Sequence, residues 1–309
     1  MKMTFSQGVM VILTLISGTS GAQEVQLLLD AKAILGEGAI WHPVENQLYW
    51  VDIEGRKLHI YDPESGKDRS LPTGEKVGTV VPVRGGGVLV ALQNGVHRMD
   101  TRNGELTFLV NAEKKPDIRY NDGKCDPAGR LWVGTIADHE KAALYRIDGD
   151  GSIHLMLDKV TCSNGIVWSA DKKTMYYVDT PTLTVMAFDY DNATGRIDNG
   201  RIVVKVPPGM GAPDGMTIDA EGKLWVAMWG GGCVTRWDPE TGKLLQKIAV
   251  PGPHTTSCAF GGKRLDTLYI TTAREGLNEE QLLKYPLSGG VFVVKPGVRG
   301  VPAEFYHQK

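Results

Sequence analysis

Short apolar or alternating runs recur along the whole chain, separated by turn residues such as Gly, Pro, Asn and Asp. Each run covers four to six residues, which is typical of β-strands. Apart from the first residues of the chain, no segment keeps the 3.6-residue period of a helix over 11 or more residues. The pattern therefore predicts an all-β protein and excludes a helical solenoid.

The strand pattern also repeats as a unit. A Gly opens an apolar strand, a run with an aromatic residue follows, and a further run leads to a polar turn. The anchor positions of these copies are 40 to 50 residues apart, the second and sixth copies being weaker: Gly38, Gly78, Gly123, Gly165, Gly215 and Ser257. About four short strands in that length make a propeller blade. Six copies predict a six-bladed β-propeller of four-stranded blades, in which residues 23–27 pair with the last copy and close the ring.

The N-terminus has the order of a secretory signal peptide. Lys2 precedes an apolar stretch over residues 9–16, and the small residues Ser20-Gly21-Ala22 follow it. The stretch is too short to span a bilayer, and a frayed strand is the alternative. We expect cleavage after Ala22, which leaves residues 23–309 as a single propeller domain in the periplasm or outside the cell, without membrane attachment.

Composition excludes some partners. The chain has 34 basic and 36 acidic residues, a net charge of −2, and no local basic patch, so nucleic acid is not expected as a partner. The four cysteines show neither a C-x-x-C motif nor zinc-ribbon spacing. Two disulfides are possible in a secreted chain, but buried free thiols are favoured, because Cys125 and Cys258 lie in strand-like runs and a core of this size needs no covalent link.

Polar residues stand directly before four of the six anchors. Glu37, Asn164 and Asp214 each precede an anchor glycine, and Asn121 and Asp122 precede another. A single Asn-Gly or Asp-Gly pair is an ordinary turn former. Their common register indicates instead that side chains from different blades converge on the central channel. Carboxylate and amide oxygens suit a hard divalent cation such as Ca²⁺, Mg²⁺ or Mn²⁺, and zinc in a mixed oxygen site is also possible.

In its repeats and polar motifs, the chain resembles the senescence-marker-protein, gluconolactonase and regucalcin family of six-bladed propellers, over essentially all of the mature sequence. The most specific motifs are Leu35-Gly36-Glu37-Gly38, Val51-Asp52-Ile53, Arg119-Tyr120-Asn121-Asp122-Gly123-Lys124, Ser163-Asn164-Gly165, Pro213-Asp214-Gly215 and Thr256-Ser257-Cys258-Ala259-Phe260-Gly261-Gly262. The resemblance implies one divalent metal ion, calcium before zinc, manganese or magnesium. Its ligands would be Glu37, Asn164 and Asp214, with Asp214 also acting as the general base.

The resemblance further implies contacts to a sugar lactone. Arg119 and Asn121 would bind the sugar, and Asp122 beside them is a further candidate. Family members often have a substrate-contacting Glu after the third strand motif, where this chain has His139. That difference leaves the sugar preference open. For Arg119, a surface ion pair with Asp117 is the alternative interpretation.

These residue types suit ester hydrolysis. A bound cation polarises the lactone carbonyl and lowers the pKa of a bound water, from 15.7 to about 7 in the best zinc sites. The chain has no G-x-S-x-G elbow, H-E-x-x-H motif or Walker loop, which excludes three common hydrolase and nucleotide-binding classes. We therefore expect a monomeric, metal-dependent lactonase that opens an aldonolactone to its acid. A metal-dependent esterase or phosphotriesterase on the same scaffold and a non-catalytic calcium-binding propeller are the alternatives.

Overall fold

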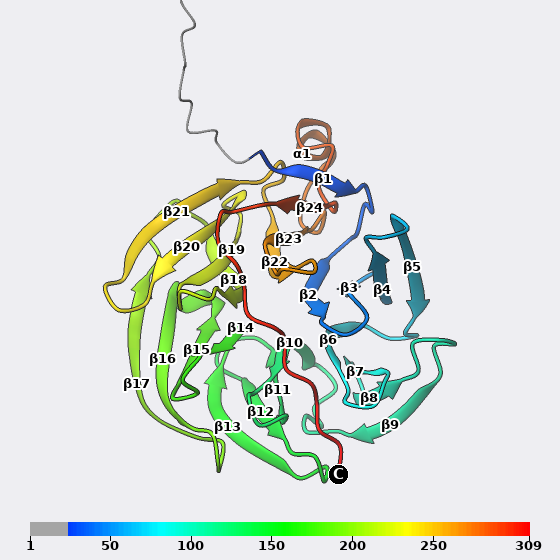
Figure 1. Cartoon of the computed structure of the whole chain (residues 1–309), viewed down its shortest axis with the longest axis vertical. Coiled ribbons are helices and arrows are strands. Elements are labelled where there is room, and N and C mark those ends of the chain that lie inside the picture. The colour runs from blue at the N-terminus through cyan, green and yellow to red at the C-terminus, as the bar shows by residue number, and fades with distance from the viewer. Residues whose placement is uncertain (1–23) are drawn as a thin grey trace, which may run out of the picture.

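Six antiparallel four-stranded sheets surround a central axis in the computed structural model, which describes residues 24–309 (Figure 1). The predicted six-bladed propeller is therefore confirmed, while the predicted signal peptide, residues 1–22, lies outside the described residues. From the axis outwards, the first five blades are β2 (Gly36–His42), β3 (Gln47–Asp52), β4 (Lys57–Asp62), β5 (Lys67–Pro72); β6 (Val77–Pro82), β7 (Val88–Leu92), β8 (Gly95–Met99), β9 (Leu106–Val110); β10 (Arg119–Cys125), β11 (Leu131–Ile136), β12 (Ala142–Ile147), β13 (Ile153–Val160); β14 (Ser163–Trp168), β15 (Thr174–Asp179), β16 (Thr184–Asp191), β17 (Arg196–Lys205); and β18 (Ala212–Ile218), β19 (Leu224–Trp229), β20 (Cys233–Asp238), β21 (Lys243–Ala249).

The sixth blade joins the two ends of the propeller. Its strands are β22 (Thr255–Gly261), β23 (Thr267–Thr272), β24 (Val291–Val294) and, outermost, β1 (Gln26–Leu29). β1 pairs antiparallel with β24. This confirms the expected closure by the early strand, and it covers the edge that β24 would otherwise expose.

The anchor positions fall on the innermost strand of every blade, where neighbouring strands approach closely. A Cβ atom added at Gly165 would lie 2.5 Å from the Cβ of Met216 on the next inner strand. One added at Gly215 would lie 2.8 Å from the Cα of Ser257, again on the following blade. At these two anchors the inner strands leave no room for a side chain.

Large aromatic side chains fill the spaces between blades. Trp50, Trp132 and Trp225 lie on the second strands of three blades and are fully buried. Two of them are fixed by the same polar contact, because Trp132 Nε1 donates to Asp126 Oδ2 (2.8 Å) and Trp225 Nε1 donates to Asp219 Oδ2 (2.9 Å). These buried carboxylates are therefore structural elements of the blades.

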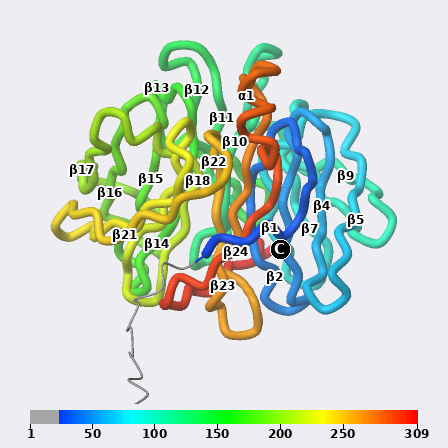
Figure 2. The backbone as a smooth tube through the Cα atoms, turned by 90° about the horizontal axis from the view of Figure 1, so that it is seen from above, coloured from blue at the N-terminus to red at the C-terminus, as the bar shows by residue number. Residues whose placement is uncertain are grey.

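The two faces of the ring carry different additions. The short helix α1 (Glu279–Lys284) lies between β23 and β24, and the 3-10 turn η1 (Thr180–Thr182) lies between β15 and β16. Figure 2 shows α1 at one face, whereas the segment after β24 turns at the other. Within residues 24–309, no helix is long and apolar enough to cross a membrane.

The C-terminal strap, residues 295–309, crosses the ring in front of the inner strands (Figure 1). Backbone hydrogen bonds attach it to three blades: Gly300 N to Leu265 O, Tyr306 N to Pro82 O and His307 N to Gly129 O. Tyr306 is fully buried, and its hydroxyl donates to the carbonyl of Asp148 (2.6 Å). The strap therefore closes one end of the central channel.

All four cysteines are free, as the sequence favours. Cys125, Cys233 and Cys258 are buried in the blades, and Cys162 is partly buried. Burial raises the pKa of the Cys125 thiol well above its usual range, which makes it a poor nucleophile.

Candidate metal and substrate site

The predicted site residues lie where the inner strands are irregular. In each blade the register between the first and second strands shifts near the anchor, as between Glu37 and Ile40 on β2 and between Pro213 and Met216 on β18. Such bulges bend a strand and re-aim its side chains. They explain how residues at the same place in several blades can all point toward the axis. The shifts in the other site-bearing blades fall between Tyr120 and Gly123 and between Ser163 and Ile166.

Glu37 and Asp214 form the centre of the site. Both side chains are buried, and their carboxyl groups are close enough to influence each other's pKa. Burial, followed by the charge of Asp122, raises the pKa of Glu37 to about 8. Burial, followed by the charges of Glu37 and Asp122, raises the pKa of Asp214 well above its ordinary value. Three carboxyl groups from three blades thus share one low-dielectric space.

Two carboxylate oxygens in this cluster have no hydrogen-bond partner. They are Asp214 Oδ1 and Asp122 Oδ2, and both are buried. The other oxygen of Asp122 accepts the backbone N–H of Gly123 (2.7 Å), and Glu37 Oε2 accepts that of Gly38 (2.9 Å). A buried acceptor without a partner costs free energy, so these oxygens are suited to a cation or to a ligand hydroxyl.

Asn164 is oriented by a relay that runs through η1 of its own blade to the next blade. Its Nδ2 donates to Thr180 Oγ1 (2.8 Å), and the Thr180 hydroxyl donates to the carbonyl of Pro213 (2.8 Å), next to Asp214. Because the amide nitrogen is used in this way, Oδ1 is left to face the cluster, where it accepts from Asn121 Nδ2 (3.2 Å). Thr180 was not predicted from the sequence, since it lies in η1 rather than beside an anchor.

Arg119 turns inward and does not form the alternative surface ion pair. Its Nη1 donates to Asn121 Oδ1 (2.7 Å) and to the carbonyl of Tyr120 (3.1 Å). No ion pair between described side chains joins Arg119 to Asp117. Asn121 in turn donates to the backbone carbonyl of Ser163 (2.7 Å), which links the third and fourth blades. Arg119 therefore keeps guanidinium donors for a ligand while its position is fixed.

Lys124 lies on the same inner strand, two residues beyond Asp122, and was not predicted as part of the site. Its amino group crosses the channel to the carbonyl of Met216 in the fifth blade. Burial lowers the pKa of Lys124, and the charge of Asp122 opposes that effect. The sequence signal that could have identified Lys124 is its position directly after the motif Asn121-Asp122-Gly123.

His139 is not part of the buried cluster. It lies in the exposed turn between β11 and β12, with a φ of 42°, and is followed by Glu140 with a φ of 57°. Among the described residues, no hydrogen bond joins its ring to Arg119 or Asn121. The role of His139 stays a prediction. The structure brings the other predicted site residues together near the axis: Glu37, Arg119, Asn121, Asp122, Asn164 and Asp214.

The cluster fits a divalent cation. No group of three or more His, Cys, Asp or Glu side chains among residues 24–309 is close enough to hold a metal by itself. The candidate ligands for a metal here are two carboxylates and an amide, those of Glu37, Asp214 and Asn164. The buried carboxyl pair and the unpartnered Asp214 Oδ1 are what such a set needs, because a cation would offset the burial and the neighbouring negative charges that raise both pKa values.

Known proteins are similar in sequence to this chain over nearly its whole length. Residues 35–274 match the SMP-30/Gluconolactonase/LRE-like region. Regucalcin of Danio rerio is 41% identical over 289 residues, which cover 92% of this chain and 98% of that protein. The Bacillus subtilis protein YvrE, named for a proposed sugar lactone lactonase activity, is 39% identical over 267 residues, or 85% of this chain and 91% of that one.

A solved structure shows the same architecture. A calcium-binding protein, regucalcin, from Agrobacterium tumefaciens superposes with a TM-score of 0.87 at 29% identity, covering 93% of this chain and 97% of that one. The matched region of residues 35–274 contains every predicted site residue from Glu37 to Asp214 and ends before the C-terminal strap.

Proposed function

Because the chain belongs to the SMP-30/gluconolactonase/LRE-like family, we propose that it hydrolyses a sugar lactone with one divalent cation in the axial site. The observation that carries this proposal is the buried carboxyl pair of Glu37 and Asp214, with an unpartnered oxygen on Asp214. The name of the Bacillus subtilis relative supports the substrate class, and the name of the Agrobacterium tumefaciens structure supports a divalent cation, calcium first.

Glu37, Asn164 and Asp214 would hold the cation, with zinc, manganese or magnesium as alternatives to calcium. All three offer oxygen atoms, which hard divalent cations prefer. When bound, such a cation polarises an ester carbonyl and stabilises the negative charge that develops on it.

Asp214 would act as the general base. One of its oxygens is free of protein hydrogen bonds, so it can take a proton from the attacking water. The water oxygen bonds to the carbonyl carbon, the ring C–O bond breaks, and the released alkoxide takes up a proton, which gives the open hydroxy acid. A well-placed base contributes about 10²–10⁴ in rate.

The sugar would be bound by polar groups beside the carboxyl pair. Arg119 is held by Asn121 and can direct its remaining N–H donors to ring hydroxyls. The unpartnered Oδ2 of Asp122 can accept from a hydroxyl. His139, on its exposed turn, would contact the outer part of the substrate. These roles place an aldonolactone such as glucono-1,5-lactone as the first substrate to test.

Two further functions fit parts of the same site. An aryl ester or phosphotriester presents a similar electrophile to the cation and Asp214, and a fold alone does not choose among substrates. A non-catalytic calcium-binding role is favoured by the name of the Agrobacterium tumefaciens structure. We further propose that the protein acts as a monomer in the periplasm or outside the cell, with neither nucleic acid nor membrane as a partner.

A pH-stat assay of chelated protein tests the function and the cation together. The protein is re-supplied separately with Ca²⁺, Mn²⁺, Zn²⁺ or Mg²⁺ and given glucono-1,5-lactone, an aryl acetate and a phosphotriester. We expect lactone hydrolysis that is lost on chelation and restored by at least one metal. Turnover of the esters without the lactone would favour the second function, and metal binding without any turnover would favour the third.

A further inference from the structure

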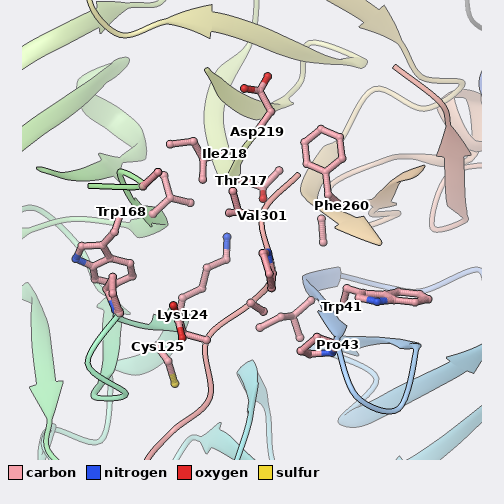
Figure 3. A pocket seen from close by; sticks show the side chains of 18 of the residues that line it. Trp41, Pro43, Lys124, Cys125, Trp168, Thr217, Ile218, Asp219, Phe260 and Val301 are labelled. Atoms are coloured by element: carbon pink, nitrogen blue, oxygen red, sulfur yellow. The ribbon is translucent and has the colours of Figure 1, made fainter. Parts of the chain in front are cut away.

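A cavity lies beneath the C-terminal strap, at the opposite end of the inner strands from the carboxyl pair. Its volume is about 510 Å³. The lining comes from the inner strands and first turns of several blades and from the strap itself, with aromatic and aliphatic side chains predominating: Trp41, Trp168, Ile218, Phe260, Val301 and Phe305 (Figure 3). Ligand sites in proteins commonly have 300–1,000 Å³ and an apolar lining with a few fixed polar groups.

Lys124 supplies such a polar group. Figure 3 shows its amino group in the middle of the ring of lining side chains. The stem passes between blades, yet the residue keeps some accessible surface, because it faces this cavity. One N–H donates to the Met216 carbonyl, and an ammonium group has three donors, so others remain for a ligand.

The other charged groups at this cavity are either engaged or peripheral. Asp219 points away from the centre in Figure 3, and its Oδ2 accepts from Trp225 and from Arg236 (2.8 Å). Glu304 and Lys172 are exposed at the rim. On the far side of Lys124 lie Asp122 and Glu37, which belong to the metal site and do not line the cavity. Lys124 is therefore the one charged group directed into the cavity from its base.

We propose that this cavity binds a small carboxylic acid with an aromatic or branched apolar body. The carboxylate accepts from the Lys124 amino group at the base, and the body packs against Trp41, Trp168 and Phe260 beneath the strap. Charge-assisted hydrogen bonds of this kind are about twice as strong as neutral ones, which favours the acid over its amide. None of the proposed metal ligands or sugar contacts lines this cavity, although Lys124 at its base interacts electrostatically with Asp122.

Isothermal titration calorimetry, run with and without a chelator, tests the proposal on the full protein. The probes are 3-phenylpropionate and its neutral match, 3-phenylpropionamide. We expect saturable binding of the acid and at least about tenfold weaker binding of the amide. Equal affinity of the two probes, or no binding of the acid, would overturn the proposal. Binding that disappears in chelator would place the acid on the metal instead, and that result would overturn the proposal as well.

Two pairs of variants locate the bound acid. Lys124→Met removes the amino group but keeps the stem, and we expect at least about tenfold weaker binding of the acid. Lys172→Met should change the affinity by less than about twofold, because exposed charges contribute little.

Ala170→Trp fills the cavity from its exposed rim and should abolish binding. Ala193→Trp, on an exposed turn between β16 and β17, is the control and should leave binding unchanged. Because Ala170 lies outside the core, its result stands if Lys124→Met fails to fold. Wild-type affinity in Ala170→Trp would contradict the proposed site.

Discussion

Glu37 in the first blade and Asp214 in the fifth are both buried at the axis of the ring, and burial, followed by the charge of Glu37, raises the pKa of Asp214. Two buried acids in one low-dielectric site ionise together only with a compensating positive charge, such as a bound cation. This relationship would tie the protonation of the site to the proposed metal binding and catalysis.

Asp214→Asn tests the proposed general base. The amide has nearly the same shape but cannot accept the proton of water, so we expect lactone hydrolysis to fall about 10²–10⁴-fold in kcat/KM. The rate is measured by pH-stat with saturating metal. Asp198→Asn, an exposed acid paired with Arg196 on β17, is the matched control and should retain the wild-type rate. A fully active Asp214→Asn protein would exclude this role.

The stability of chelated protein should depend on pH through Glu37. Its pKa is about 8 in the folded protein against an ordinary 4.5, so the folded state binds more protons between these values and loses stability as pH rises through them. Asp214 shifts in the same direction. Thermal unfolding of wild type and Glu37→Gln at pH 5, 6.5 and 8 measures the effect as a difference. In chelator, we expect the stability of wild type relative to Glu37→Gln to decrease as the pH rises. A relative stability that increases with pH would show that the pair is ionised without a cation.

Thr180→Val tests the relay that orients Asn164. Without the hydroxyl, the amide nitrogen loses its acceptor and Oδ1 is no longer held toward the cluster. Groups that orient metal ligands typically change affinity 10–100-fold, so we expect a loss of about that size in a calcium titration. Thr182→Val, in the same turn but exposed, should bind calcium as wild type does. Equal affinities of the two variants would remove Thr180 from the site.

Tyr306→Ala tests the attachment of the C-terminal strap. The side chain is fully buried and its hydroxyl donates to Asp148, so truncation should lower the free energy of unfolding by about 3–5 kcal/mol. Urea unfolding provides the measurement. Phe108→Ala, at an exposed position of β9, should cost far less. Similar costs for both variants would mean that the strap adds little to the stability of the ring.

The sequence predicts the blades well because most copies place a glycine where inner strands touch, as at Gly165. The same register predicts Glu37, Asn164 and Asp214 together, since the bulges lie at equivalent positions. Thr180 escapes prediction because its role depends on a contact between blades. The cavity at Lys124 could not be predicted either, because the strap that covers the cavity is not part of any repeat.

An anomalous diffraction map of Mn²⁺-soaked crystals tests the central claim most directly. We predict one strong peak inside the ring, bonded by side-chain oxygens of Glu37, Asn164 and Asp214. A peak that is not bonded to all three of these residues would contradict the account. A site that shows no metal peak after soaking with Mn²⁺, Ca²⁺ or Zn²⁺ would contradict it as well.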